Sequence, residues 1–167
     1  DCAESLGATY KKNEKNTLGD IGAFSFFGNK MITTGEGGMV LFKKKSHYEK
    51  AKILRDHGMS KTKKYYHVEV GFNLRMTNIQ AAIGVAQLSS FKKFLHKRKS
   101  NYKKFYSKLK SLNNIKFQKI EKWAESSFWL YTILLNEKSS ISKAEFLKKL
   151  EISGVETRPI FYPFSLM

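Results

Sequence analysis

One lysine separates two apolar runs in the first quarter of this 167-residue chain. The runs are residues 23–27 and 39–42, and Lys30 lies at the turn after the first run. Burial between apolar segments disfavours the charged form of an amine, and the neutral amine is the form that attacks a carbonyl carbon. Lys30 is therefore a candidate nucleophile for Schiff-base chemistry. The alternative interpretation is a surface lysine at the end of a strand.

The other polar residues that could take part in chemistry also have ordinary structural interpretations. Asp1 is a candidate helix N-cap, and Ser25 is a candidate core hydroxyl within an aromatic strand. Asn73, just before a predicted helix, is typical of a turn. Glu4 fits a solvated helix face, and His67 fits aromatic packing beside two tyrosines. Residue types and spacing alone therefore leave these roles open.

Several segments resemble the DegT/StrS-type sugar aminotransferases, in the order in which that family carries them. The matching segments are SFFGNK at 25–30, TTGEGG at 33–38, and residues 1–8, 55–59, 71–82 and 156–163. The resemblance implies a fold-type I enzyme that depends on pyridoxal phosphate (PLP). The implied fold class is α/β, comprising the C-terminal part of the large domain plus part of an α+β small domain.

The resemblance also implies residue roles. Lys30 matches the lysine that holds the cofactor, and Asp1 matches the aspartate that binds the pyridinium nitrogen. Ser25 matches a phosphate-binding hydroxyl, and Glu4 matches a side chain near the ring oxygen of the cofactor. Asn73 resembles an asparagine that reaches across a homodimer to the cofactor phosphate of the neighbouring subunit. Four further residues are substrate-side candidates, His67, Arg75, Phe161 and Tyr162. An ion-pair role for Arg75 stays open.

The implied reaction converts a nucleotide-linked 4-keto-6-deoxy sugar to the 4-amino sugar, with glutamate as the amino donor, for surface polysaccharide or glycan synthesis. The lysine segment resembles that of perosamine synthases, which act on a GDP-linked sugar. Two alternatives remain at this point. One is a sugar dehydratase of the same fold, which uses pyridoxamine phosphate and carries histidine where this chain has Lys30. The other is a non-catalytic basic binding module.

Composition limits the classes of binding partner that we expect for this chain. The formal charge of +17 comes mostly from lysines that are mixed with asparagine and large apolar residues, with no nucleic-acid-binding motif. We therefore expect a solvated basic surface and no nucleic-acid partner. Cys2 is the only cysteine, and no apolar stretch approaches 18 residues. These features predict no metal site, no membrane span and a cytoplasmic protein.

Periodicity and capping patterns predict the elements that position these residues. We expect helices over residues 1–7 and 46–57, and a long helix that begins at Thr77 and bends before continuing to Leu109. Strands are predicted at 115–120, 128–135 and 155–158, with another helix from Ser142 to Gly154. The resemblance divides the chain into residues 1–90, part of the large PLP-binding domain, and residues 91–167, an interdomain helix with part of the small domain. It also predicts that this chain is a fragment and is inactive alone.

Overall fold

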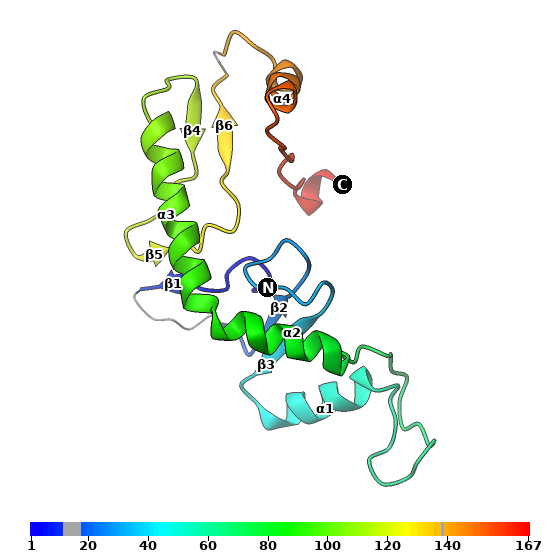
Figure 1. The fold of residues 1–167 in the computed structure, drawn as a ribbon. Helices are drawn as coiled ribbons and strands as arrows, with labels where there is room; N and C mark the ends of the chain where they lie inside the picture. The colour runs from blue at the N-terminus through cyan, green and yellow to red at the C-terminus, as the bar shows by residue number, and fades with distance from the viewer. Residues whose placement is uncertain (12–17, 138) are drawn as a thin grey trace. The chain divides into compact units, whose positions relative to one another are not determined.

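The computed structural model describes residues 1–11, 18–137 and 139–167. The chain, drawn as a ribbon in Figure 1, divides into two compact units. Unit 1 comprises Asp1–Lys108 and Lys119–Tyr131, and unit 2 comprises Leu109–Gln118 and Thr132–Met167. The assignment of residues 1–90 and 91–167 to a large and a small domain stays a prediction.

Unit 1 is built on an antiparallel hairpin of β2 (Ile21–Ser25) and β3 (Gly38–Phe42). Its register pairs Ile21 with Phe42 and Ser25 with Gly38, so that residues 26–37 connect the paired ends. Both predicted strands are therefore confirmed, with β2 beginning two residues before the apolar run. Alternation along β2 buries Phe24, and a small core forms where β2 meets the first residues of the chain and the connection. This core consists of Cys2, Phe24, Phe26 and Ile32.

The predicted helix at residues 1–7 is wrong, because this segment forms successive turns. Ser5 N donates to Cys2 O at 3.2 Å and Ala8 N donates to Ser5 O at 2.8 Å, which are three-residue rather than four-residue spacings. Cys2 N instead donates to Ala23 O at 2.8 Å, which fastens this segment to β2. Gly7, at a φ of +86°, then turns the chain away. Asp1 does accept a cap-type hydrogen bond from Ala3 N. However, the backbone bond from Cys2 N to Ala23 O holds the segment against β2, and no helix forms.

Three helices complete most of unit 1: α1 (Lys45–Arg55), α2 (Asn78–Ser89) and α3 (Phe91–Leu109), of which residues up to Lys108 belong to this unit. The capping box predicted at Thr77 is confirmed. Thr77 Oγ1 accepts from Gln80 N at 3.2 Å, and Gln80 Oε1 accepts from Thr77 N at 3.0 Å. The predicted break in the long helix falls at Ser90, between α2 and α3.

Residues 124–131 lie along one face of α3. Arg98 Nη1 donates to Trp129 O at 2.6 Å, and the Tyr102 ring stacks on Phe128 with centroids 3.7 Å apart. The four-residue spacing of Arg98 and Tyr102 places both side chains on the same face. The predicted strand over 128–135 is only partly confirmed, because β6 spans Ile133–Leu135 and Phe128 has a φ of 52°. A short pair that the sequence did not predict joins β1 (Thr9–Tyr10) to β5 (Ala124–Glu125).

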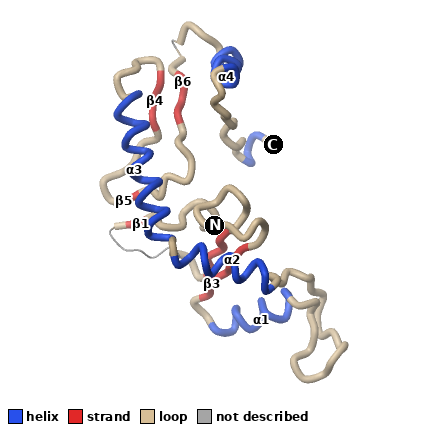
Figure 2. Tube along the Cα trace, viewed as in Figure 1, coloured by secondary structure: helices blue, strands red, loops and turns tan. Residues whose placement is uncertain are grey.

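Unit 2 contains an antiparallel pair, β4 (Ile115–Phe117) with β6, followed by α4 (Lys143–Ile152) and the 3-10 turn η1 (Phe164–Leu166). Ser142 Oγ accepts from Glu145 N at 3.2 Å, so the predicted helix start is confirmed. The predicted strand at 155–158 is wrong, because these residues form an irregular connection, shown in tan in Figure 2. A short segment forms a strand only where an edge is available for pairing. No helix in the described part of the chain is long and apolar enough to cross a bilayer.

Candidate active site

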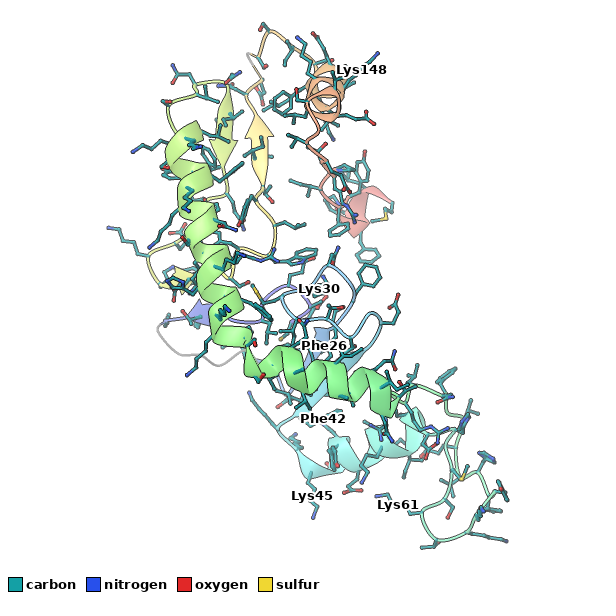
Figure 3. All side chains as sticks on the ribbon, in the orientation of Figure 1. Phe26, Lys30, Phe42, Lys45, Lys61 and Lys148 are labelled. Atoms are coloured by element: carbon teal, nitrogen blue, oxygen red, sulfur yellow. The ribbon has the colours of Figure 1, made fainter. Side chains whose placement is uncertain are left out.

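Lys30 lies in the connection between β2 and β3, and Figure 3 shows it at the end of the hairpin with Phe26 nearby. Backbone hydrogen bonds hold this connection. Phe26 N donates to Gly37 O at 2.9 Å, and Thr34 N donates to Phe26 O at 3.0 Å. Lys30 N donates to Phe27 O at 3.0 Å, which closes a tight turn at the lysine itself. The Lys30 side chain is only 12% exposed, as expected for a lysine held between apolar segments.

Two glycines, one at the end of this connection and one at the start of β3, are required by contacts within the chain. A Cβ at Gly38 would lie 2.5 Å from Phe24 O across the strand pair. At Gly37, which has a φ of +136°, a Cβ would lie 2.8 Å from Thr34 Oγ1 and from Met76 Cε. Thr34 is itself 4% exposed and donates to Glu36 O at 2.7 Å. The glycines therefore allow the connection to fold tightly over itself, which fixes the backbone that carries Lys30.

The Lys30 ammonium is held between a carboxylate and an indole ring. Its Nζ lies 3.9 Å from Glu4 Oε1 and 3.7 Å from the centroid of the Trp129 ring. Ser127 Oγ donates to Glu4 O at 3.2 Å, so the segment that carries Trp129 also contacts the backbone of Glu4. Three segments far apart in the sequence therefore meet at the amine, and the structure brings two of the predicted residues, Lys30 and Glu4, together.

Asp1 and Ser25 are both anchored at β2. Asp1 Oδ1 accepts from Ala3 N at 2.8 Å, an interaction of the N-cap type, and the next residue is bonded to the β2 backbone at Ala23. Ser25 ends β2, and its Oγ accepts from Phe27 N at 3.3 Å. That bond uses an acceptor of the hydroxyl, so the Ser25 hydrogen can donate to an anion. Both roles implied by the resemblance stay predictions.

Asn73 and Arg75 form a group with Asp56 beside the C-terminal end of α1. Asn73 Oδ1 accepts from Arg75 Nε at 3.3 Å, and Arg75 Nη1 lies 3.2 Å from Asp56 Oδ1. A bridge between Asp56 and Asn73 joins the backbones of the two segments. The ion-pair interpretation of Arg75 is thus observed. Since the amide oxygen of Asn73 already accepts from Arg75, its amide hydrogens are the donors that could reach a phosphate.

The remaining substrate-side candidates are exposed. His67 Nδ1 donates to His57 O at 2.8 Å. Phe161 and Tyr162 belong to unit 2 and are 75% and 69% exposed. The substrate roles of these three residues stay predictions.

A pocket in the described part of unit 1 has a volume of about 590 Å³ and is lined in part by Met31, Arg98, Trp129 and Tyr131. None of Asp1, Glu4, Ser25 or Lys30 lines it. A cofactor lysine must be among the lining groups of its own site, so this pocket does not define the cofactor site.

Trp129 is the residue of this site that sequence reasoning missed. The alternation of residues 128–135 assigned it to a two-sided strand, whereas it is 9% exposed with its Nε1 donating to Asn29 O at 2.9 Å. A buried indole needs an acceptor for its N–H group, but the sequence does not say which segment supplies it.

Comparisons with known proteins identify the family of this chain. The family model described as the DegT/DnrJ/EryC1/StrS aminotransferase family matches residues 1–167. The GDP-perosamine synthase of Caulobacter vibrioides is 42% identical over 100% of this chain and 45% of its own length. This chain therefore spans less than half of that curated relative.

Solved structures show the same fold. An E. coli GDP-4-keto-6-deoxy-D-mannose-3-dehydratase with bound hydrated PLP has a TM-score of 0.87 at 26% identity, covering 95% of this chain and 44% of that one. The Helicobacter pylori aminotransferase PseC, involved in the biosynthesis of pseudoaminic acid, has a TM-score of 0.82 at 29% identity, covering 91% and 42%. The predicted α/β fold of the PLP-dependent sugar aminotransferases is thus confirmed, and this chain belongs to the DegT/DnrJ/EryC1/StrS aminotransferase family.

Proposed function

We propose that the protein containing this chain is a PLP-dependent aminotransferase that forms a 4-amino sugar from a nucleotide-linked 4-keto-6-deoxy sugar. The observation that carries the proposal is Lys30, a 12% exposed lysine fixed in the tight connection of the hairpin. The 42% identity to a GDP-perosamine synthase over the full chain supports GDP as the nucleotide. Glutamate is the proposed amino donor, and the cytoplasm is the proposed location.

The donor set fits PLP by its chemistry. The aldehyde of PLP would be held as an imine by a primary amine. Lys30 supplies that amine, and its Nζ lies between Glu4 and Trp129. A phosphate requires hydrogen-bond donors, which the Ser25 hydroxyl and the Asn73 amide supply. A protonated pyridine nitrogen requires a carboxylate, for which Asp1 is the candidate on the segment bonded to β2. Glu4 would lie near the ring oxygen.

PLP, when bound, supplies an electron sink that stabilises negative charge on the reacting carbon. The chain's own residues supply the rest. Lys30 Nζ is the atom that accepts and returns a proton at that carbon, and the low exposure of its side chain limits competition from bulk water for the proton. The Glu4 carboxylate, 3.9 Å from Nζ, favours an orientation of the amine toward the turn segment at residues 1–8.

The proposal extends to a homodimer with two shared sites. Asn73 lies just before the capping box of α2, where the chain changes direction, and such a junction can direct a side chain away from its own core. If Asn73 serves the partner's cofactor, neither subunit has a complete site without the other.

The proposal is tested with the full-length protein, GDP-4-keto-6-deoxymannose and ¹⁵N-labelled glutamate. We expect a sugar nucleotide that carries ¹⁵N, identified by mass spectrometry, and no such product from Lys30→Ala. A product that has lost a hydroxyl and contains no ¹⁵N would instead establish the dehydratase alternative. That alternative is tested because a solved dehydratase has the same fold as this chain. An unchanged sugar nucleotide, with no cofactor bound, would favour the binding module.

A further inference from the structure

We propose that Trp129 is a positioning residue for Lys30, and that it acts through both its indole N–H group and its ring face. This inference rests on the proposed role of Lys30 as the cofactor lysine. It concerns a residue 99 positions along the chain for which neither the motifs nor the comparisons give a role.

The indole N–H group fixes the backbone next to the lysine. Trp129 Nε1 donates to Asn29 O at 2.9 Å, and Asn29 immediately precedes Lys30. The carbonyl of Asn29 belongs to the peptide unit that Lys30 continues, so this bond restrains the point from which the lysine side chain begins. A hydrogen bond to a carbonyl from a side chain that is 9% exposed has little competition from water.

The ring face holds the other end of the same side chain. Lys30 Nζ lies 3.7 Å from the ring centroid, well inside the roughly 6 Å limit for a cation–π contact. Tryptophan is the best aromatic partner for an ammonium, and burial strengthens the attraction. One side chain thus restrains both the backbone and the Nζ atom of Lys30.

Trp129 is itself held by α3. Arg98 Nη1 donates to Trp129 O at 2.6 Å, and Tyr131 Oη donates to Arg98 O at 3.1 Å. The residue before Trp129 is stacked on Tyr102, and Ser127, 3% exposed, donates to Glu4 O. The indole therefore occupies a fixed place between α3 and the hairpin connection, as a positioning group requires.

The test measures how often the Lys30 amine leaves the ring. Full-length protein stripped of cofactor is treated with a trace of acetic anhydride at fixed pH, and acetylation of Lys30 is quantified by peptide mass spectrometry. The exposed Lys148 on α4 serves as the internal reference in each sample. Because acetylation requires Nζ to move off the indole, its rate reports the strength of the contact without any dependence on catalysis.

In Trp129→Leu we expect Lys30 acetylation to rise by about 2- to 30-fold relative to Lys148, the range that ~0.5–2 kcal/mol of cation–π attraction corresponds to. In Trp129→Phe, which keeps a ring but loses the N–H group, we expect an intermediate rise. Trp123→Leu is the matched control, because Trp123 is 51% exposed and packs on Tyr10 instead. We expect no change in that variant.

An unchanged Lys30 rate in folded Trp129→Leu would overturn the proposal. If Trp129→Leu does not fold, a Lys30 rate in Trp129→Phe equal to wild type would overturn it equally. In the loaded enzyme, Trp129→Phe should lower kcat more than it raises KM, since the indole contacts the lysine that transfers the proton. The acetylation result stands even if the cofactor is found on another lysine, so the two proposals fail separately.

Discussion

At the residue scale, the contacts of the Lys30 amine are unequal in energy. The Glu4 carboxylate is 53% exposed and 3.9 Å away, and an ion pair of that exposure contributes at most about 1 kcal/mol. The Trp129 ring is buried and 3.7 Å away, and a desolvated cation–π contact contributes about 2 kcal/mol. The indole is therefore the stronger restraint on the amine, whereas the Glu4 carboxylate mainly favours one orientation of the amine.

Asp1 has an observed structural role and a proposed cofactor role, and one substitution separates them. In Asp1→Asn the amide oxygen can still accept from Ala3 N, because asparagine and aspartate cap equally well, so the melting temperature should not change. The charge opposite the pyridinium nitrogen is lost, and turnover should fall by about 10²-fold or more, as for other preorganised electrostatic partners. Calorimetry and steady-state kinetics measure the two effects. Full turnover in Asp1→Asn would leave Asp1 as a cap alone.

At the scale of elements, Tyr102 on α3 packs against two aromatic residues of the segment 124–131 and helps to hold that segment in place. Tyr102 stacks on Phe128 and meets the Tyr131 ring edge-on, with centroids 5.6 Å apart. Burial raises the pKa of Tyr102, and the charge of Tyr106 raises it further. Burial also raises the pKa of Tyr131, against an opposing effect of Arg98. Both phenols are therefore favoured in their neutral form in the folded protein.

These raised pKa values predict a loss of stability in alkali. A group whose pKa is higher folded than unfolded contributes stability that is fully present below the unfolded pKa and is lost as the pH rises through the folded one. For both tyrosines that loss begins above about pH 10. Urea unfolding at several pH values should show a steeper alkaline decline in wild type than in the Tyr102→Phe and Tyr131→Phe double variant. Equal slopes would show that neither phenol is sufficiently buried.

Sequence patterns within a few residues predicted where some helices begin. Whether other segments form a helix or a strand depended on backbone pairing with distant parts of the chain. The Thr77 capping box lies within four residues, so the sequence alone determines where α2 begins. The segment at 1–7 has an equally good start for a helix, but its backbone bonds to Ala23 instead. Residues 155–158 have strand-forming side chains without a paired edge among the described residues. Such outcomes depend on segments that are distant in the sequence.

The site shows the same division. Lys30, Gly37 and Gly38 lie within one short segment, so their arrangement could be predicted from that segment alone. Trp129 reaches the lysine only because Phe128 adopts a φ of 52° and α3 holds the segment, and neither fact is visible in the alternation of residues 128–135. Residue roles that arise within one segment could be predicted from the sequence. The contact between Trp129 and Lys30, which forms only on folding, could not.

At the scale of the whole molecule, the proposed shared sites depend on Asn73 and Lys30 acting from different chains. Loss of the Asn73 amide should weaken PLP binding by about 1–3 kcal/mol, the value of a hydrogen bond to a charged group. At a cofactor concentration that leaves Asn73→Ala empty, that variant and Lys30→Ala should each be inactive. Mixed dimers would hold one site that lacks both groups and one intact site.

Subunit exchange between these two variants should therefore restore about a quarter of wild-type activity, since half the dimers are mixed and each has one intact site. Native mass spectrometry, with one variant labelled with ¹⁵N, confirms that mixed dimers have formed. If exchanged dimers stay inactive, both residues serve a site within one chain, and the shared-site proposal is wrong.

The identity of the cofactor lysine tests the central claim most directly. The full-length protein, loaded with PLP, is reduced with borohydride, digested and mapped by mass spectrometry. We expect one cofactor adduct, on Lys30, and none in Lys30→Ala, which should stay folded because its side chain makes no backbone hydrogen bond in the described structure. An adduct on any other lysine, or no adduct on the loaded wild-type protein, would contradict the account.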